Sequence, residues 1–519
     1  MNEETESWKN KLETRFSAGV ADGEVATELL LFQLGGVQDF IAQARSAHDL
    51  WSGSYLTAWL MAHALKAVTD DIGPNAVVFP SLKESSVFGA LQSDAPRGDP
   101  LNPALPNRFL AVVPAGQGQA FAEKAENALR TELTRIGDSV FQEAWNRTLW
   151  DDQLNNFPYI TWAVHPWQKG ENWTSAYAAL EDKLAARRNT HNFAASKEKA
   201  NERKDSLSGK EEAIALDGNK PYGAMNLIKR KWAKVYLEKR VGTKNIRFDV
   251  SDAPSIAILA MDGDEMGKLL SGEKLANEQK RIPAYHLGVS QALIRFAEQR
   301  VRKVVEDDCS GTLVYAGGDD VLAVLPANQA IDCARALRNA FRQAFGSSIS
   351  CDLSCGIAVG SKKAPLQMIV KEAHRMVEAA KSEYGRAALA IALYKRSGEI
   401  VEWGCKWGSA AWELMGNITE LSRGRNSKLS GRLPHTLLQH LQPYGLEAPI
   451  FSKEIILTEF AHVLSRLNVD SGGNSRYELL KQANEYLDLL SKEKVKNRIC
   501  DFLNLFLVEN FINRKRGEH

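Results

Sequence analysis

The sequence has few cysteines, no long apolar run and no secretion signal. Six cysteines stand in 519 residues and form no Cys-x-x-Cys pair. In a chain of this size they are most simply buried thiols, so we expect no structural zinc. No apolar run approaches the length of a membrane span, and the start MNEETESWKN lacks a positive region followed by an apolar core. These absences predict a cytoplasmic protein.

The sequence also has almost no net charge. A formal charge of +1 gives no global signature of polyanion binding. Any nucleic-acid contact must therefore come from local patches or from partner subunits. The length predicts three or four domains, since a domain usually takes about 100–200 residues.

What the sequence does contain is an acidic turn between two apolar runs, LVYAGGDDVLAVLP at 313–326. Apolar runs rich in Val, Leu and Tyr on both sides of a glycine-containing turn predict a β-hairpin. Its turn presents Asp319 and Asp320, whose carboxylates repel each other and suit a hard divalent cation such as Mg²⁺ or Mn²⁺. A solvated turn is the alternative, because Asp and Gly are ordinary turn residues.

A second acidic strand end lies upstream, in SIAILAMDGDEMGKLLSG at 255–272. A buried-strand run there leads into Asp262, Gly263 and Asp264. The elements from this strand to ALAIAL read β-α-β-β-α-β, an order in which the first strand and the hairpin share one sheet. Asp262 and Asp319 are therefore predicted at neighbouring strand ends. Two metal ions held there would suit the in-line phosphoryl transfer of a polymerase-type palm.

The N-terminal half repeats this order of elements. The strand run ELLLFQLGG leads through Gly35 and Gly36 into a helical stretch with an interruption at Gly53. A helix that starts after glycines suits phosphate binding, although this signal alone is weak. Further strands are expected at 75–82, 107–114 and 159–166. Residues from about 401 onward show helical spacing with little strand signal.

A polar, charged stretch at 184–217 separates the two halves and predicts a linker or an exposed insertion. From Lys229 to Arg247 the chain then has eight Lys and Arg against the single acid Glu238, interleaved with Trp232 and Tyr236. Basic side chains among aromatics favour nucleic-acid contact, and a solvated helix face explains them equally well. The weak RNA-binding candidates are Lys229, Arg230, Lys231 and Lys234.

At four stretches in order, LGGVQDFIAQARSAHDLWSGS, LPNRFLAVVP, AMDGDEMGK and YAGGDD, the chain resembles the large cyclase-like subunit of type III CRISPR effector complexes, most closely the Cmr (type III-B) form. The resemblance implies an α+β fold with two ferredoxin-like palm domains, the first degenerate and the second catalytic, and a helical C-terminal domain. The expected parts are a tail (1–27), the first palm (28–185), a charged insertion (186–250), the catalytic palm (251–400) and the helical domain (401–519).

The resemblance also implies an activity and partners. Guide RNA, target RNA and other Cmr-type subunits are the expected partners, and target pairing is expected to switch on cyclic oligoadenylate synthesis from ATP. Asp262, Asp319 and Asp320 would hold magnesium with the Gly263 carbonyl as a further ligand. An adenosine 3′-hydroxyl would attack the α-phosphate of a second ATP, and pyrophosphate would leave. The nucleotide-binding candidates are Gly317, Gly318, Lys381, Arg386, Gly35, Gln38 and Ser54.

Three departures from the family pattern change these expectations. About 27 residues precede the first palm, which leaves no room for an HD nuclease domain. Asp205-Ser206-Leu207-Ser208-Gly209 stands where Cys-x-x-Cys-Gly is expected, so a sulfur-ligated zinc is not expected. The loop of the first palm reads Gly35-Gly36-Val37-Gln38 where a Gly-Pro is more usual, a small change that should leave the helix start intact.

Three alternatives stay open on the sequence. The same palm could join ATP to another acceptor and give a different adenylated messenger. The chain could instead be a non-catalytic RNA-binding scaffold, although three crowded carboxylates argue against that. A diguanylate-cyclase-like enzyme is disfavoured by the missing sensor domain and by the second palm.

Overall fold

The chain folds as two compact units. A computed structural model describes residues 27–92, 102–168, 171–190, 203–241, 255–273, 283–346, 351–422, 429, 431–467, 474–492 and 497–513. One unit comprises Met1–Asp249, Glu265–Ala323 and Ala336–Cys351, and the other comprises Val250–Asp264, Val324–Arg335 and Asp352–His519. The predicted tail at 1–27 lies outside the described residues, Thr27 excepted.

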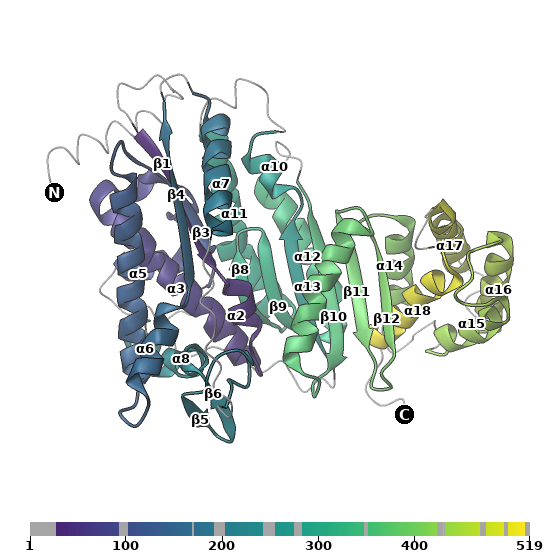
Figure 1. The fold of residues 1–519 in the computed structure, drawn as a ribbon. Helices are drawn as coiled ribbons and strands as arrows, with labels where there is room; N and C mark the ends of the chain where they lie inside the picture. Colours follow the sequence, from purple (N-terminus) through teal and green to yellow (C-terminus); the bar gives the residue numbers. More distant parts are fainter. Residues whose placement is uncertain are drawn as a thin grey trace. The chain divides into compact units, whose positions relative to one another are not determined.

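The first unit contains an antiparallel four-stranded sheet in the order β2-β3-β1-β4 (Figure 1). Strand β1 is buried along most of its length, as its run TELLLFQLG predicts. Helices α3 and α5 separate the strands in the order β-α-β-β-α-β, which confirms the predicted palm, and α7 packs on β4 and β1. The strands are β1 (Thr27–Gly35), β2 (Val77–Phe79), β3 (Arg108–Pro114) and β4 (Tyr159–Trp167), and the helices are α2 (Val37–Ala42), α3 (Ala47–Ile72), α4 (Ser86–Gln92), α5 (Gly118–Val140), α6 (Arg147–Asn155) and α7 (Trp173–Asn189).

The predicted helix interruption at Gly53 is wrong. The break comes earlier, between α2 and α3, where the Ser46 side chain caps α3 by accepting from the Asp49 backbone N–H at 3.1 Å. Gly53 lies inside α3. A Cβ at this position would lie 2.8 Å from Cδ of Lys229, so Gly53 marks close packing and not a helix end.

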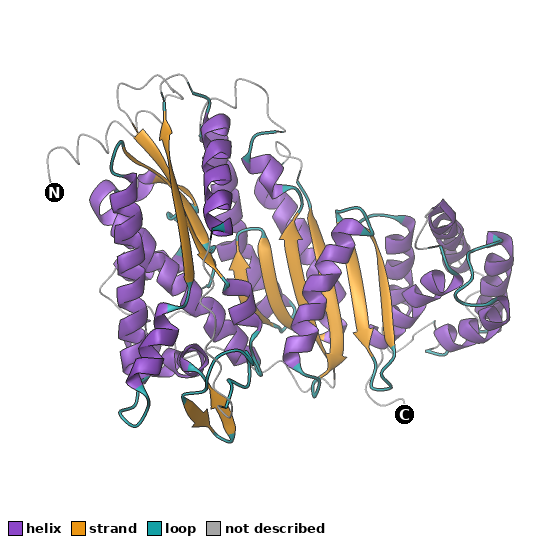
Figure 2. Cartoon of the chain, in the orientation of Figure 1, coloured by secondary structure: helices purple, strands orange, loops and turns teal. Residues whose placement is uncertain are grey.

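The second palm is built on a six-stranded sheet in the order β12-β11-β10-β7-β9-β8 (Figure 2). Its strands β10, β7, β9 and β8 repeat the strand order of the first palm, and β11 runs parallel to β10. The strands are β7 (Ser255–Gly263), β8 (Thr312–Gly317), β9 (Asp320–Pro326), β10 (Leu353–Ser361), β11 (Ala388–Tyr394) and β12 (Ile400–Lys406). The helices are α10 (Met266–Leu270), α11 (Ala284–Arg295), α12 (Ala330–Phe345) and α13 (Leu366–Ser382).

Strand β12 is an element that the sequence analysis missed. It pairs antiparallel with β11 from Ile400 to Lys406, so the sheet continues beyond the predicted boundary at 400. Val401, Trp403 and Cys405 are buried and alternate in the sequence with Glu402, Gly404 and Lys406, of which only Gly404 is also buried. This period of two was a strand signal, but it is short and follows directly on a turn.

The C-terminal part is helical, as predicted. Its core contains the aromatic rings of Phe460, Phe502 and Phe506, which pack against one another in edge-to-face or tilted arrangements. Trp403 of β12 donates from Nε1 to the hydroxyl of Tyr486 at 3.1 Å, which joins the sheet to these helices. The helices are α14 (Ala410–Ser422), α15 (Leu433–Leu441), α16 (Lys453–Arg466), α17 (Asn474–Lys492) and α18 (Ile499–Asn513). No described helix combines the length and apolarity needed to cross a membrane.

A partly buried carboxyl group links α4 to the helical turns that follow α11 in the first unit. Oε1 of Glu298 accepts from the backbone N–H and the hydroxyl of Ser86, at 2.8 and 3.1 Å. Burial raises the pKa of Glu298 to about 7, and the negative charge of Glu84 adds to this, while the Ser86 hydrogen bonds and Arg302 oppose it.

Glu298 therefore predicts a pH dependence of stability. Between about pH 4.5 and 7 the folded chain keeps a proton that the unfolded chain has released, so stability falls as the pH rises through this window. Glu298→Gln is expected to remove this slope and to stabilise the protein at pH 8 by at most about 3 kcal/mol. Unfolding midpoints of both proteins from pH 5 to 8 test this. Parallel curves for the two proteins would show that Glu298 does not titrate in this window.

Candidate active site

The end of β7 presents Asp262 beside a lysine of α13. Nζ of Lys381 contacts Oδ2 of Asp262, and the two side chains are 16 % and 37 % exposed. Burial lowers the pKa of His374, which lies about two turns before Lys381 on the same face of α13, against the opposing charges of Asp262 and Glu378. A neutral imidazole and an ammonium group therefore lie near this carboxylate. The sequence analysis predicted both Asp262 and Lys381, and the structure brings them together.

Asp264, two residues on, has a different environment. Its side chain is only 7 % exposed, Oδ1 accepts from the hydroxyl of Ser354 at 2.7 Å, and Oδ2 accepts from the backbone N–H of Ala387 at 2.7 Å. Nη1 of Arg386 lies 3.8 Å from Oδ1. Burial raises the pKa of Asp264. The hydrogen bonds from Ser354 and Ala387 and the positive charges of Lys381 and Arg386 oppose this rise. The sequence analysis gave Asp264 no role.

The predicted acidic hairpin forms, and its turn belongs to the first unit. Strand β8 ends at Gly317 and β9 begins at Asp320, so Gly318 and Asp319 make the turn. Gly318 has a φ of +90°, which a side chain would strain. A Cβ on Gly317 would collide with the Tyr315 hydroxyl at 1.6 Å. Gly318 is therefore required by the backbone of the turn, whereas Gly317 leaves room for the Tyr315 side chain. Asp319 and Asp320 are both half-buried.

Arg108, at the start of β3, is a neighbour of this turn that the sequence analysis missed. Its Nη2 contacts Glu181 of α7 and lies 3.4 Å from the Tyr177 hydroxyl. Burial lowers the pKa of Arg108, but Tyr177, Glu181 and Asp319 raise it, and the net shift is upward. The motif NRFLAVVP matches DDVLAVLP, so a basic residue of the first palm stands where the second palm has Asp320.

The predicted union of Asp262 with Asp319 stays a prediction. Strand β7 is the neighbour of β9 in the sheet order, but the two aspartates belong to different compact units. Among the described residues, no three Asp, Glu, His or Cys side chains gather closely enough to hold a metal ion. The oxygen donors predicted for magnesium are nevertheless of the right chemical type, and Asp262 already attracts a cationic group.

The nucleotide-binding candidates of the first palm, Gly35, Gln38 and Ser54, lie in different environments. A Cβ on Gly35 would lie 3.0 Å from the Tyr159 ring, and Gln38 is exposed. Helix α2, which follows them, has only six residues and is too short for its N-terminus to hold a phosphate. Ser54 is fully buried inside α3, and its role as a nucleotide contact stays a prediction.

The basic segment is also corrected. It forms α8 (Ala224–Trp232), the turns Ala233–Leu237 and α9 (Glu238–Val241), and its Lys244 and Arg247 lie outside the described residues. Lys229 is fully buried, with Nζ donating to the backbone carbonyls of Phe40 (2.7 Å) and Gln43, and burial lowers its pKa to about 7. Lys229 is therefore not available to RNA at the surface.

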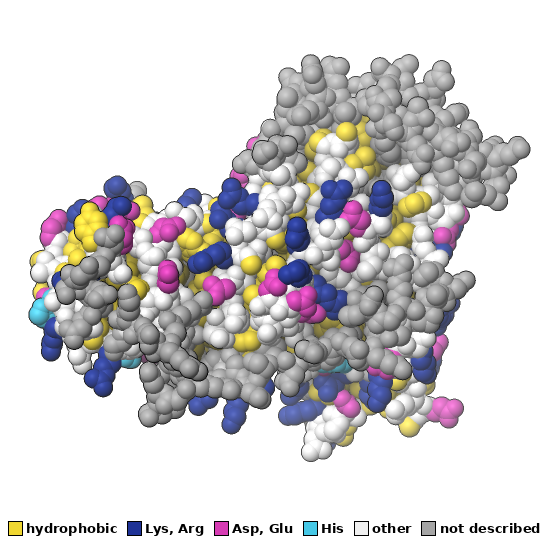
Figure 3. All heavy atoms as spheres, turned by 180° about the vertical axis from the view of Figure 1, so that it is seen from behind, with side chains coloured by type: hydrophobic (Ala, Val, Ile, Leu, Met, Phe, Trp, Pro, Cys, Tyr) yellow, Lys and Arg dark blue, Asp and Glu magenta, His cyan; other side chains and the backbone are white. Residues whose placement is uncertain are grey.

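The other three RNA candidates lie nearer the surface. Arg230 pairs with Asp49 and Asp217, Lys231 lies over the Trp145 ring, and Lys234 is exposed. Trp232 and Tyr236 are buried, so neither offers a ring for base stacking. On the face shown in Figure 3, Lys and Arg are interspersed with Asp and Glu.

The segment where a zinc motif was expected is held by Asp205. Its Oδ1 accepts from the N–H groups of Leu207 and Ser208, both at 2.7 Å, and from the Asn226 amide at 3.0 Å. Oδ2 accepts from the Gly223 N–H at 2.6 Å. One buried carboxylate therefore ties the turn at 205–209 to the start of α8 by hydrogen bonds to four N–H groups.

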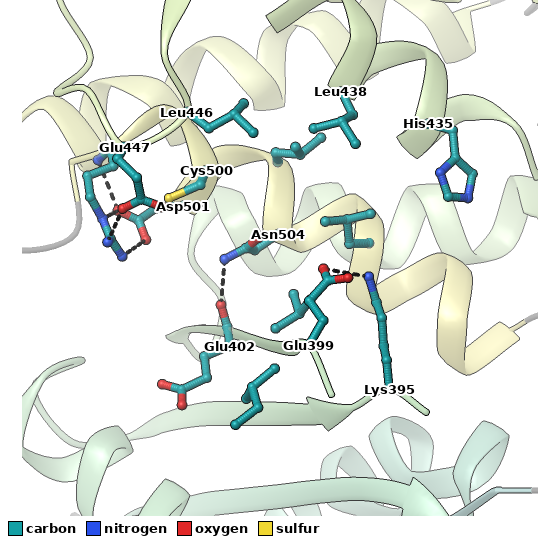
Figure 4. A pocket seen from close by; sticks show the side chains of 15 residues that line it. Lys395, Glu399, Glu402, His435, Leu438, Leu446, Glu447, Cys500, Asp501 and Asn504 are labelled. Carbon is teal, nitrogen blue, oxygen red and sulfur yellow. Dashed lines mark hydrogen bonds and ion pairs between the residues drawn. The ribbon is translucent and has the colours of Figure 1, made fainter. Parts of the chain in front are cut away.

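A pocket of about 530 Å³ lies in the second unit, between β12 and the helices α15 and α18 (Figure 4). Its polar groups bind one another. Lys395 pairs with Glu399, Arg498 pairs with Glu447 and Asp501, and Asn504 donates to the Glu402 carbonyl at 2.9 Å. The pocket is lined by none of the predicted site residues.

The order of the elements defines a protein with two palm domains in tandem. The family described as "Cas10/Cmr2, second palm domain" matches residues 255–390, and "CRISPR-associated protein Cmr2, N-terminal" matches residues 29–138. Two separate parts of the chain therefore match models of Cas10/Cmr2 proteins.

A curated protein is similar to most of this chain. The "CRISPR system Cmr subunit Cmr2" of Pyrococcus furiosus is 26 % identical over 549 aligned positions, which cover 72 % of this chain and 63 % of the relative. The match therefore spans less than two thirds of that relative's length.

Solved structures share the fold. A type III-B Cmr-beta complex has a chain with a TM-score of 0.68 and 12 % identity in its apo state, covering 97 % of this chain and 83 % of that chain. A chain of the same type of complex bound to cognate target RNA has a TM-score of 0.66 and 13 % identity, and the match covers 99 % of this chain and 85 % of that chain. A chain of a Csm1-Csm4 cassette in complex with cA4 has a TM-score of 0.56 and 13 % identity, and the match covers 96 % of this chain and 71 % of that chain.

Proposed function

We propose that the chain is the large subunit of a type III-B CRISPR RNA-guided effector complex, and that its second palm makes cyclic oligoadenylate from ATP when target RNA pairs with the guide. The observation that carries the proposal is the ion pair of Asp262 with Lys381 at the end of β7, in the sheet that also contains the Asp319 and Asp320 hairpin. The match of residues 255–390 to the second palm domain of Cas10/Cmr2 supports it.

Different residues of the chain would bind the metal and the triphosphate. Asp262, Asp319 and Asp320 are the proposed magnesium ligands, with the Gly263 carbonyl beside them. Bound magnesium would polarise the α-phosphate and favour ionisation of the attacking hydroxyl. Lys381 and Arg386 would bind the triphosphate and orient it. A bond forms between the 3′-oxygen of one nucleotide and the α-phosphorus of the next, pyrophosphate leaves and the hydroxyl proton passes to solvent.

The partners are proposed on the same basis. The similar Cmr-beta structures include one bound to cognate target RNA, and the similar Csm1-Csm4 cassette is in complex with cA4. We propose guide RNA, target RNA and Cmr-type subunits as partners of this chain, ATP as its substrate, and a cytoplasmic location.

One assay tests the proposal. The complex is reconstituted with guide and target RNA, supplied with labelled ATP and Mg²⁺, and its products are identified by mass spectrometry. We expect cyclic oligoadenylates from the native protein and at least about a thousandfold less from Asp319→Ala/Asp320→Ala. An adenylate joined to another acceptor would indicate a different messenger. Equal product from the double variant, or none from either protein, would reject the assignment to this palm.

A further inference from the structure

We propose that Asp264 is a positioning residue: it holds the loop Gly385-Arg386-Ala387 in a left-handed conformation and so presents Arg386, beside Lys381, to the triphosphate of ATP. This inference rests on the proposed function. It assigns ATP affinity to a carboxylate that lies two residues from Asp262 but has no part in metal binding.

Both oxygens of the Asp264 carboxylate are engaged by neighbours within the second unit. Ser354 of β10 donates to Oδ1 and the Ala387 backbone donates to Oδ2, both at 2.7 Å. The Asp264 backbone N–H also donates to the Asp352 carbonyl at 2.9 Å. The carboxylate is therefore fixed on the sheet side and binds the loop through one backbone N–H.

The loop it binds is strained. Gly385, Arg386 and Ala387 have φ values of 74°, 64° and 44°, so two residues with a Cβ adopt the left-handed region. Such residues lose free energy there and keep the conformation only where their surroundings enforce it. Side chains and backbone groups fix the loop at several points: Arg386 N–H donates to the Ala380 carbonyl (3.1 Å), Trp407 N–H to the Ala387 carbonyl (3.0 Å), and Lys406 Nζ to the Gly385 carbonyl (3.1 Å).

The loop joins the phosphate-binding candidates. It follows the end of α13, where Lys381 contacts Asp262. The Arg386 side chain is 48 % exposed and its Nη1 is 3.8 Å from Asp264, so the guanidinium is oriented by the carboxylate and still accessible to an anion. Without the Ala387 hydrogen bond the strained backbone would relax and turn Arg386 away. ATP affinity would then fall more than the rate of transfer.

Backbone strain supplies a test that separates this role from a general structural one. Glycine at 387 removes the cost of the left-handed conformation, so Ala387→Gly should restore part of what Asp264→Ala loses. If Asp264 contributed only charge or core hydrogen bonding, glycine at 387 would restore nothing.

The test uses the assembled complex with target RNA and Mg²⁺. Binding is measured with α,β-methylene-ATP, which cannot release pyrophosphate, and KM and kcat are measured with ATP. We expect Asp264→Ala to raise the Kd at least about tenfold with a smaller change in kcat, and the added Ala387→Gly to recover about fivefold of the affinity. Asp488→Ala, which removes an aspartate from a surface ion pair with Lys453, is the matched control and should bind as the native protein does.

The outcomes are distinguishable. If the native complex makes product and Asp264→Ala binds the analogue with unchanged affinity, or if Ala387→Gly recovers nothing, the positioning role is wrong and the proposed function stands. If the native complex neither binds the analogue nor makes product, the proposed function fails first. Should Asp264→Ala not fold, Asp264→Asn keeps the shape and one acceptor oxygen, and a Kd raised about threefold or more supports the role. An unchanged Kd for Asp264→Asn overturns it.

Discussion

Replacing Asp262 by asparagine is expected to reduce nucleotide transfer at least about a thousandfold and to leave RNA binding and complex assembly unchanged. Asparagine preserves the size of the side chain and one oxygen but removes the negative charge. The Asp262 carboxylate is more open than that of Asp264, and its contact in the structure is a cation, Lys381. A charge in this position is suited to attract magnesium, and an amide is not.

The contrast with Asp264 makes this prediction specific. The two carboxylates are two residues apart but have different partners. Both oxygens of Asp264 accept hydrogen bonds, from Ser354 and Ala387, whereas Asp262 contacts the long side chain of Lys381. We therefore expect Asp262→Asn to lower kcat with the affinity for α,β-methylene-ATP changed much less. The Asp264 variants should instead lower the affinity for the analogue more than they lower kcat.

The measurement is product formation by the assembled complex with target RNA, alongside a gel-shift of the same RNA. Asp488→Asn, at the surface pair with Lys453, is the control for loss of one negative charge. Product from Asp262→Asn within tenfold of the native rate would mean that Asp262 is not a metal ligand.

Local patterns in the sequence were sufficient to predict the palms. In the acidic hairpin, two runs with β propensity and two glycines define the turn, and the structure places Gly318 at a φ of +90° there. The run SIAILAMDG also predicts a buried strand ending in Asp262, and β7 ends one residue later at Gly263. These features depend on neighbours in the chain, so the sequence contains their signal.

Packing between distant segments could not be predicted in the same way. Lys229 looked like part of a solvated or RNA-binding basic run, but its ammonium group is buried against the carbonyls that end α2. Ser54 looked like a polar residue after a glycine, but it lies in the buried middle of α3. Asp264 received no role because its partners, Ser354 and Ala387, are 90 and 123 residues away in the chain.

Gly356 shows how a residue with no chemistry fixes the position of the site. It lies in β10, between Ala260 of β7 and Ala390 of β11. A Cβ at Gly356 would lie 2.3 Å from the Ala373 carbonyl oxygen and 2.3 Å from the Val377 nitrogen, both backbone atoms of α13. The helix that carries Lys381 therefore packs directly on the strand backbone.

Gly356→Ala is expected to destabilise the protein by about 3 kcal/mol or more, because a backbone cannot yield as a flexible side chain can. Any chain that still folds must shift α13 away from β10, which moves Lys381 from Asp262 and weakens ATP binding. Gly288→Ala is the matched control: it lies in α11 with nothing within 4 Å of its added Cβ, and alanine should be neutral or stabilise by up to about 1 kcal/mol. Unfolding midpoints of both variants test this. Equal midpoints would show that α13 does not pack on Gly356 as closely as the structure indicates.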